Sequence, residues 1–224
     1  RVAVKVAING NKTLRTFAKE AENANRVGHP SIVRIHDVGN WRGIDYLVSE
    51  LIDGQPLGMF HEATRLDPIG CARVVAEIAD AIAAAHVKGV VHRDLKPSNI
   101  MIEVEDRFVQ NQSPEIAQDP LFEHHRVRVL DFGIAKLDGR ETKMTRTGDI
   151  LGTPHYMSPE QAAGRADSVD GRSDIYSMGV ILFELLTGKL PFEGSESVVI
   201  NSIRTIKPPR VRSIRSDIPL ALDS

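Results

Sequence analysis

The sequence predicts an α+β protein in two lobes, with a smaller strand-rich part followed by a larger helical part. Residues 1–53 hold short β-branched, alternating segments, whereas apolar residues at helical spacing dominate from Asp67 onward. A chain of 224 residues is long enough for one large domain or for two small lobes around a shared cleft. We therefore expect a first lobe at residues 1–53 and a second lobe at residues 54–224.

The first part is expected to contain three strands and one helix. Alternation predicts strands at Val2–Ile8, Ile32–Val38 and Tyr46–Leu51, and helical spacing predicts a helix at Leu14–Val27. Gly28 closes this helix, and Gly39 and Gly43 mark a turn between the second and third strands.

The second part is expected to be built on two long helices. Asp67 as N-cap and Pro68 at the first helical position begin one of them, and Gly89 ends it. The other is expected from Ser173 to Thr187. The apolar residues at helical spacing are Ile69, Val74, Val75, Ile78, Ile82 and Ala85 in the first helix and, facing inward, Ile175, Met178, Ile181, Leu182, Leu185 and Leu186 in the second.

Two short apolar strands are expected between these helices, at Ile100–Ile102 and Val127–Leu130. Residues 103–126 between them are polar and predict an exposed insertion. His124 and His125 are expected to lie on the surface of that insertion and not in a metal site.

Composition excludes several classes of protein. Hydrophobic residues make up 42% and charged residues 26%, which is ordinary for a globular protein. The net charge of -2 offers no electrostatic footprint for nucleic acid and no polybasic segment for membrane contact. The longest apolar stretches, such as Val74–Val87, fall short of the roughly 20 residues that a membrane span needs. We therefore expect neither nucleic-acid binding nor membrane contact by this segment.

The chain has a single cysteine, Cys71, so no intrachain disulfide can form. This indicates a reducing compartment, and we expect a cytoplasmic domain in which Cys71 is a small core residue. The chain opens on Arg1-Val2-Ala3-Val4 without an initiating Met, which indicates a strand joined midway. We expect a fragment of a longer protein, which leaves open a membrane anchor, a sensor domain and dimerisation.

Five separated motifs place polar residues at the ends of apolar elements. They are Val2-Ala3-Val4-Lys5, Glu20 on the first helix, His92 to Asn99, Asp131-Phe132-Gly133 and Gly152 to Glu160. Taken alone, Lys5 and Glu20 could be exposed surface charges, and Asp131-Phe132-Gly133 could be a simple turn after a strand. The segment from His92 to Asn99 is harder to dismiss, because it places an acid, a base and an amide in one loop between an apolar helix and an apolar strand.

Together these motifs resemble those of eukaryotic-type protein kinases, most closely the bacterial serine/threonine branch, over essentially the whole chain except residues 103–126. The resemblance implies a two-lobed kinase fold that binds ATP and Mg²⁺. Lys5 matches the lysine that contacts the α- and β-phosphates, and Glu20 the glutamate that orients it. Asp131 and Asn99 match the oxygen ligands of magnesium.

Asp94 matches the residue that accepts the proton of the incoming hydroxyl, and Lys96 the one that stabilises the transferred phosphoryl group. The segment Asp94-Leu95-Lys96-Pro97-Ser98-Asn99 and Thr153 are typical of the serine/threonine class. The resemblance therefore implies protein substrates with Ser or Thr acceptors, in bacterial signalling.

The adenine site is also implied by resemblance. Ser49-Glu50-Leu51-Ile52 resembles the hinge whose backbone reads adenine, with Glu50 and Leu51 at its centre and Ser49 at the back of the pocket. Ala3 and Met101 match the residues that sandwich the ring. The alternative, that both are plain core residues, stays open.

The stretch from Asp131 to Glu160 resembles an activation segment, in which Phe132, Gly133 and Glu160 are structural residues. Thr145 and Thr147 lie within it, and the resemblance implies their autophosphorylation, with Arg93 receiving the phosphate. The alternative is a pair of ordinary exposed loop threonines.

Asp174 resembles the buried acid that anchors the catalytic loop through backbone N–H groups. The alternative is a first-turn acid that the helix dipole favours.

The sequence also departs from the family pattern. No G-x-G-x-x-G stands before Lys5, and the chain ends before the family's last helices, so no arginine partner of Glu160 can be named. We therefore expect these 224 residues alone to bind ATP poorly.

Three other classes of protein fit the sequence less well than a protein kinase. A pseudokinase would lack Lys5, Asp94 or Asp131, all of which are present, and a small-molecule kinase would lack the Ser-Pro-Glu segment and the Arg93 arrangement. A purely structural domain gives no reason for five polar motifs at the ends of apolar elements.

Overall fold

The computed structural model describes residues 1–7, 13–104, 125–132 and 154–223. Two three-stranded antiparallel sheets organise the chain, one in the order β1-β3-β2 and the other in the order β4-β5-β6. The strands are β1 (Val2–Val6), β2 (Ile35–Trp41), β3 (Ile44–Glu50), β4 (Gly54–Pro56), β5 (Ile100–Val104) and β6 (His125–Val129). The α-helices are α1 (Leu14–Val27), α2 (Leu57–Thr64), α3 (Pro68–Val87), α4 (Pro159–Ala162), α5 (Gly171–Thr187) and α6 (Glu196–Thr205).

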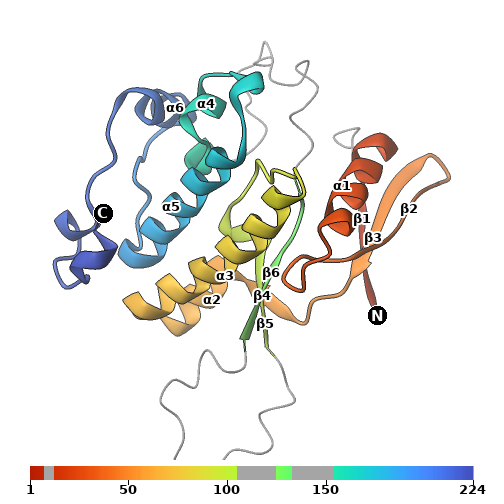
Figure 1. Ribbon diagram of the computed structural model, residues 1–224, viewed down its shortest axis with the longest axis horizontal. Coiled ribbons are helices and arrows are strands. Elements are labelled where there is room, and N and C mark those ends of the chain that lie inside the picture. The colour runs from red at the N-terminus through yellow and green to blue at the C-terminus, as the bar shows by residue number, and fades with distance from the viewer. Residues whose placement is uncertain (8–12, 105–124, 133–153, 224) are drawn as a thin grey trace, which may run out of the picture.

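The first sheet belongs to the strand-rich part of the molecule, and the second sheet lies between that part and the longer helices. Figure 1 shows α1 with β1, β2 and β3 on one side, the longer helices on the other, and the small sheet β4-β5-β6 between them. The predicted α+β class, with strands first and helices afterwards, is confirmed.

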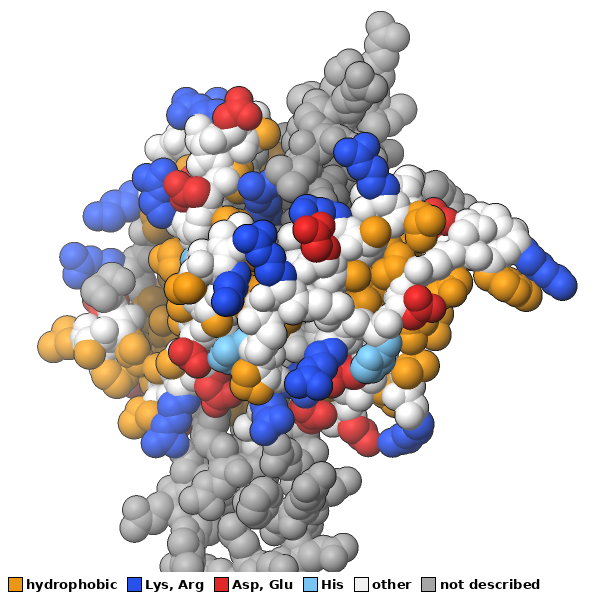
Figure 2. Space-filling view, turned by 45° about the vertical axis from the view of Figure 1, so that its right-hand side comes forward, with side chains coloured by type: hydrophobic (Ala, Val, Ile, Leu, Met, Phe, Trp, Pro, Cys, Tyr) orange, Lys and Arg blue, Asp and Glu red, His pale blue; other side chains and the backbone are white. Residues whose placement is uncertain are grey.

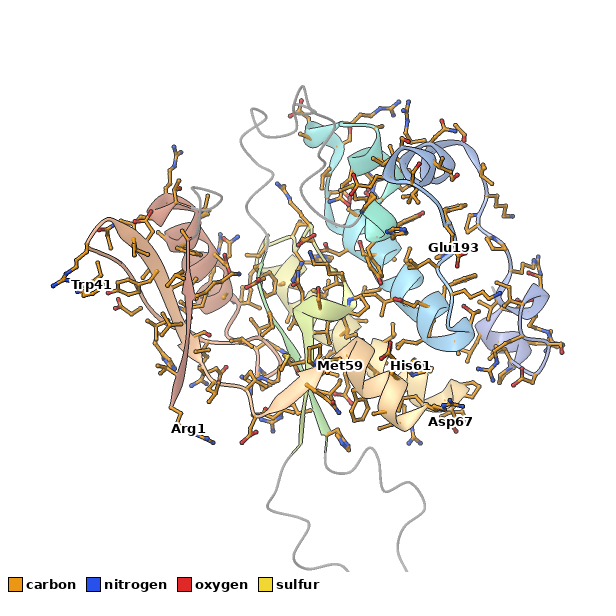
Figure 3. All side chains as sticks on the ribbon, turned by 180° about the vertical axis from the view of Figure 1, so that it is seen from behind. Arg1, Trp41, Met59, His61, Asp67 and Glu193 are labelled. Carbon is orange, nitrogen blue, oxygen red and sulfur yellow. The ribbon has the colours of Figure 1, made fainter. Side chains whose placement is uncertain are left out.

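The first sheet turns between β2 and β3 on a two-residue hairpin. Trp41 pairs with Ile44, and the two residues between them, Arg42 and Gly43, both have positive φ, of 52° and 84°. Positive φ at both central positions suits the right-handed twist of the flanking strands. The turn was predicted at Gly39 and Gly43, but Gly39 lies inside β2, so only the Gly43 part is correct. Trp41 stands exposed at the tip of the hairpin (Figure 3).

Helix α1 was predicted with its observed bounds, and the α3 prediction was also confirmed. The Asp67 side chain accepts a hydrogen bond from the Gly70 N–H at 2.6 Å, so it caps α3 as the sequence predicted. Asp67 marks the beginning of this helix in Figure 3. Cys71 is buried in the core, as predicted.

Helix α3 forms the centre of the second part. Its fully buried residues Ile78, Ala81 and Ala85 belong to a core that also includes residues of α5 and of β5 and β6. This core supplies the rigid support from which the loops between α3, β5 and β6 project, and it is built mainly by apolar burial.

Two apolar residues at helical spacing are exposed, and one of them, Ile175, was predicted to face inward. Ile69 and Ile175 are each 57% exposed, although both stand at helical spacing with core residues. In α5 the reason is a reversal of the usual rule, because the polar residues Ser173 and Asp174 are buried in its first turns and Ile175 is left facing outward. Ile69 lies in the first turn of α3, where no described contact covers it.

The predicted insertion is shorter than residues 103–126. Residues 103 and 104 extend β5, and His125 and Arg126 begin β6, where Val104 pairs with His125. His125 is a partly buried strand residue whose ring lies 4.9 Å from that of Phe60, so the prediction of a surface-loop histidine is wrong there. His124 and the rest of the insertion lie outside the described residues. Helix α2 was not predicted.

The surface carries charges of both signs. On the face shown in Figure 2, Lys and Arg side chains are interspersed with Asp and Glu side chains. Among the described residues, no helix is both long and apolar enough to cross a membrane.

Candidate active site

Three charged side chains from three elements meet at the first sheet. Lys5, on β1, places its Nζ 3.6 Å from Oε1 of Glu20, on α1, and 2.5 Å from Oδ2 of Asp131, which follows β6. Glu20 is only 4% exposed, so it is not the exposed helix acid of the alternative interpretation. A buried carboxylate needs such a partner, because an unpaired buried charge is costly. Residues 126 positions apart in sequence are thereby joined.

A second cluster lies in the loop after α3. Nζ of Lys96 is 2.9 Å from Oδ2 of Asp94, and Nδ2 of Asn99 donates to the same carboxylate oxygen at 3.2 Å and to the Asp94 carbonyl at 2.8 Å. These contacts hold the three polar side chains in one group and fix the orientation of the Asp94 carboxylate. The Asn99 amide uses its hydrogens on Asp94, so its Oδ1 is the atom that can ligate a cation.

Backbone bonds connect the two clusters. The Leu130 N–H donates to the Asn99 carbonyl at 2.8 Å, and Nε2 of His92 lies 2.8 Å from the Leu130 carbonyl. His92 is fully buried, and its ring is 4.9 Å from that of the buried Phe132. The loop that carries Asp94 and the strand end that carries Asp131 are therefore held side by side.

Asp174 fastens the candidate catalytic loop, residues 92–99, to α5. Its side chain is 0% exposed, and it accepts hydrogen bonds from the backbone N–H groups of His92 at 2.9 Å and Arg93 at 2.8 Å. Nε2 of His86, on α3, lies 2.8 Å from Oδ2 of the same carboxylate. A Cβ on Gly171 would come within 2.9 Å of the His86 ring, so the absence of a side chain there allows α3 and α5 to approach at this point.

The backbone of Arg93 is held in an uncommon conformation. Its φ is +68°, a region that non-glycine residues rarely adopt. Its N–H is bound to Asp174, and its carbonyl accepts a hydrogen bond from Nε2 of Gln161 at 2.7 Å. Oε1 of Gln161 accepts in turn from the Ser158 N–H at 2.9 Å. Gln161 thus joins the cap of α4 to the catalytic loop.

The residues around α4 are also fixed to α5. The Ser173 hydroxyl donates to Oε1 of Glu160, and the Tyr156 hydroxyl donates to Oε2 of Glu184 at 2.7 Å. Burial alone would raise the pKa of Glu160, but hydrogen bonds from Ser173, from backbone N–H and from Ser158 hold that pKa below its ordinary value. Burial raises the pKa of Glu184, and the bond from Tyr156 only partly offsets this.

A cavity of about 320 Å³ opens beside the Lys5 cluster. Its lining includes the predicted nucleotide residues Ala3, Lys5, Glu20, Glu50, Leu51, Met101 and Asp131. Ser49 and Ile52 of the predicted hinge line it as well, with apolar Val33, Leu47 and Val129. A largely apolar cavity with a few charged groups, among them the Lys5 ammonium, suits a ligand that has a flat ring and an anionic tail.

The donor set at the charged end fits a hard cation. Asp131 and Asn99 supply carboxylate and amide oxygens, which magnesium prefers. The Lys5 ammonium already contacts the Asp131 carboxylate, which shows that this group faces a cationic partner beside the cavity. Asp131 also has a positive φ of 52°, so its backbone is held in a conformation that few non-glycine residues adopt.

Several predicted residues cannot be compared with the structure. Gly133, Thr145 and Thr147 lie outside the described residues. Arg93 is described and partly buried next to Asp94, but the stretch in which its phosphate partner was expected is not.

Sequence reasoning missed three residues that the structure brings to this region. His86, Gln161 and Arg128 make side-chain bonds to Asp174, Arg93 and Glu50, respectively. His86 and Arg128 gave no signal in sequence, because their partners are 88 and 78 positions away. Gln161 could have been found as the fourth residue of a capping box that begins at Ser158.

The fold and this arrangement define the class of two-lobed kinases. The chain belongs to the protein kinase family: the model described as "Protein kinase domain" matches residues 1–219.

Named relatives are bacterial. The chain is 41% identical over 217 residues to serine/threonine-protein kinase Pkn1 of Myxococcus xanthus, covering 93% of this chain and 29% of that protein. It is 38% identical over 204 residues to PrkC of Bacillus subtilis strain 168, covering 89% of this chain and 28% of that protein. The chain therefore spans under a third of the length of these relatives. Among solved structures, the PknI kinase domain of Mycobacterium tuberculosis matches with a TM-score of 0.66 and 28% identity, covering 99% of this chain and 74% of that one.

The bond from Gln161 to Arg93 is expected to stabilise the fold. Gln161→Glu keeps the acceptor for the Ser158 N–H but removes the donor to the Arg93 carbonyl, so we expect the free energy of unfolding to fall by about 1–3 kcal/mol. Urea denaturation of the full-length protein measures this change. Ser158→Ala is the comparison variant, since it leaves the Gln161 amide in place and removes the side-chain cap and the bond from Ser158 to Glu160; the loss of the cap is expected to cost about 1 kcal/mol. A Gln161→Glu variant as stable as the unmodified protein would contradict the role of this bond.

Proposed function

We propose that the protein is an ATP-dependent serine/threonine protein kinase, in which Asp94 accepts the hydroxyl proton and Lys5, Asn99 and Asp131 hold the magnesium-bound nucleotide. One observation carries the proposal: the Lys5–Glu20–Asp131 cluster lines a cavity, and the Asp94–Lys96–Asn99 cluster is joined to it by the bond from the Leu130 N–H to the Asn99 carbonyl. Moving a γ-phosphoryl group needs a held triphosphate, a hard cation and a proton acceptor, and these clusters provide residues for each.

Each residue has a stated task in the proposed reaction. When bound, Mg²⁺·ATP supplies the phosphoryl group and neutralises its charge. Asp131 and Asn99 hold the cation through oxygen atoms, and Lys5, oriented by Glu20, binds the α- and β-phosphates. The hinge backbone at Glu50 and Leu51 and the apolar faces of Ala3 and Met101 position adenine.

Asp94 acts on the acceptor. Its carboxylate orients a Ser or Thr hydroxyl and takes the proton as the oxygen–phosphorus bond forms and the bond to the β-phosphate oxygen breaks, releasing ADP. Lys96, 2.9 Å from the Asp94 carboxylate, is close enough to stabilise charge on the transferred group. Serine/threonine specificity is supported by the relatives' names and by Lys96 itself.

We further propose that residues 1–53 and 54–224 act as the two lobes of this kinase, because the first sheet ends at Glu50 and the second begins at Gly54. The use of ATP and the single cysteine, Cys71, support a cytoplasmic location.

Substitution of Asp94 tests the proposal most simply. Asp94→Asn keeps the size of the side chain but removes the proton acceptor, so we expect kcat to fall by about 10²–10⁴-fold while nucleotide affinity stays within about twofold. Radiolabelled phosphate transfer to a general protein substrate, with nucleotide binding measured in parallel on the full-length protein, gives both values. Asp167→Asn, at an exposed acid, is the control. Nucleotide binding without any phosphate transfer by the unmodified protein would instead support a pseudokinase.

We also propose that Thr145 and Thr147 are autophosphorylated and that Arg93 receives the phosphate. A phosphothreonine adds up to about two negative charges and pairs well with a guanidinium, which orders the segment that carries it. A Thr145→Ala/Thr147→Ala variant is expected to lose phosphate from this segment and to transfer phosphate more slowly. Mass spectrometry after incubation with ATP, together with the transfer assay, checks both expectations, and unchanged phosphate content and activity would contradict them.

A further inference from the structure

Arg128 is a buried arginine that no sequence pattern marked as a functional residue. The Arg128 side chain, on β6, is only 8% exposed. Its Nη2 donates to Oε1 of Glu50 and its Nη1 to Oε2 of Glu103 at 3.0 Å. One guanidinium thus binds two carboxylates from two different strands.

These contacts join three of the strands that line the cavity, β3, β5 and β6. Glu50 is the last residue of β3 and lines the cavity with Leu51 and Ile52. Arg128 pairs across the sheet with Met101, another lining residue, and stands three positions before Asp131. The hinge is therefore tied through one side chain to the strand pair that carries the opposite wall of the cavity.

Glu50 is also bonded to the backbone of Arg34. Its Oε1 accepts a hydrogen bond from the Arg34 N–H at 2.7 Å, and its own N–H donates to the Arg34 carbonyl at 3.0 Å. Burial alone would raise the pKa of Glu50, but the bonds from Arg34 and Arg128 lower that pKa below its ordinary value, so the carboxylate stays ionised and bound. The side chain of Glu50 is therefore engaged with Arg34 and Arg128, and its N–H with Arg34.

Removal of the arginine would leave two carboxylates close together without their common partner. A partly buried acid that loses its cation must turn toward water or take up a proton. For Glu50 either change disturbs the end of β3, and with it the backbone of residues 50–52. Because Glu50 lines the cavity, a freed carboxylate would also bring negative charge toward a polyanionic ligand.

We propose that Arg128 is a positioning residue for adenine: it holds the hinge at residues 50–52 in its binding geometry by tying Glu50 to β5 and β6. This inference rests on the proposed function, because it takes an adenine nucleotide as the ligand of the cavity. Arg128 acts through Glu50 and does not itself line the cavity.

Binding of adenosine and of ADP, measured by calorimetry on the full-length protein, tests the proposal without relying on turnover. Arg128→Met keeps the length of the side chain and removes its charge. We expect it to weaken both ligands by about tenfold, which corresponds to the loss of roughly one hydrogen bond to adenine. In phosphate-transfer assays the KM for ATP is expected to rise by a similar factor while kcat changes by less than about threefold.

Two further variants separate positioning from other effects. Arg126→Met removes an exposed arginine from the same strand and is expected to bind both ligands as the unmodified protein does. In Arg128→Met/Glu50→Gln the unpaired acid is removed together with its partner, but the tie from the hinge to β5 and β6 is still missing, so we expect adenosine affinity to stay low, whereas full recovery would show a charge effect and overturn the inference. This double variant also guards against failure of the single variant to fold, because it leaves no uncompensated charge on Glu50.

The outcomes are distinct. Unchanged affinity of Arg128→Met for adenosine would overturn the inference, and so would a loss confined to ADP, since that would show a charge effect and not a positioned hinge. An unmodified protein that binds neither ligand would overturn the proposed function itself.

Discussion

The catalytic loop depends on one buried carboxylate. Asp174 accepts the N–H groups of His92 and Arg93 and lies within hydrogen-bond distance of His86, so one side chain on α5 holds three residues from the end of α3 and the loop after it. A fully buried carboxylate is tolerated only when such partners replace its lost hydration. The same bonds hold the backbone of Arg93 at a positive φ, and this conformation sets the direction of the chain at the next residue, Asp94.

Long-range pairing assembles the rest of the site from parts that are individually ordinary. Lys5 lies on a strand, Glu20 on a helix and Asp131 at a strand end, and they come within bonding distance because α1 packs against β2 and β3 and because Val129 of β6 is bonded to the backbone of Ser31 and Val33. The hinge is fixed in a comparable way, because Arg128 and the Arg34 backbone both hold Glu50. In each case a buried or half-buried charge is satisfied by partners far away in sequence, which makes the geometry of the site a property of the whole fold.

The sequence predicted local structure well where periodicity and end signals agreed. Helix α1 with Gly28 after it and helix α3 with its Asp67 cap are examples, since their hydrogen bonds lie within a few residues. Prediction failed where tertiary contacts reverse local rules, as in α5, where buried Ser173 and Asp174 leave Ile175 exposed. The predicted insertion was too long for a similar reason, because His125 and Arg126 pair with β5 and so belong to β6.

The residues of the candidate site also differ in how well the sequence predicted them. The motifs around Lys5, Asp94 and Asp131 could be recognised because their residue types are unusual where they stand. Arg128 and His86 could not be recognised, because the sequence does not show that these side chains are buried or which distant residues they contact.

Amide hydrogen exchange at His92 and Arg93, compared between the unmodified protein and Asp174→Asn, tests the central claim most directly. Asparagine has one carbonyl oxygen and presents N–H groups where the second oxygen accepted, so at least one of the two amides loses its acceptor. We predict at least about tenfold faster exchange at these amides, with exchange at Ile78 in the core of α3 little changed. Asp170→Asn, at the exposed cap of α5, should leave all three amides protected. Equal protection of His92 and Arg93 in Asp174→Asn and the unmodified protein would contradict the account.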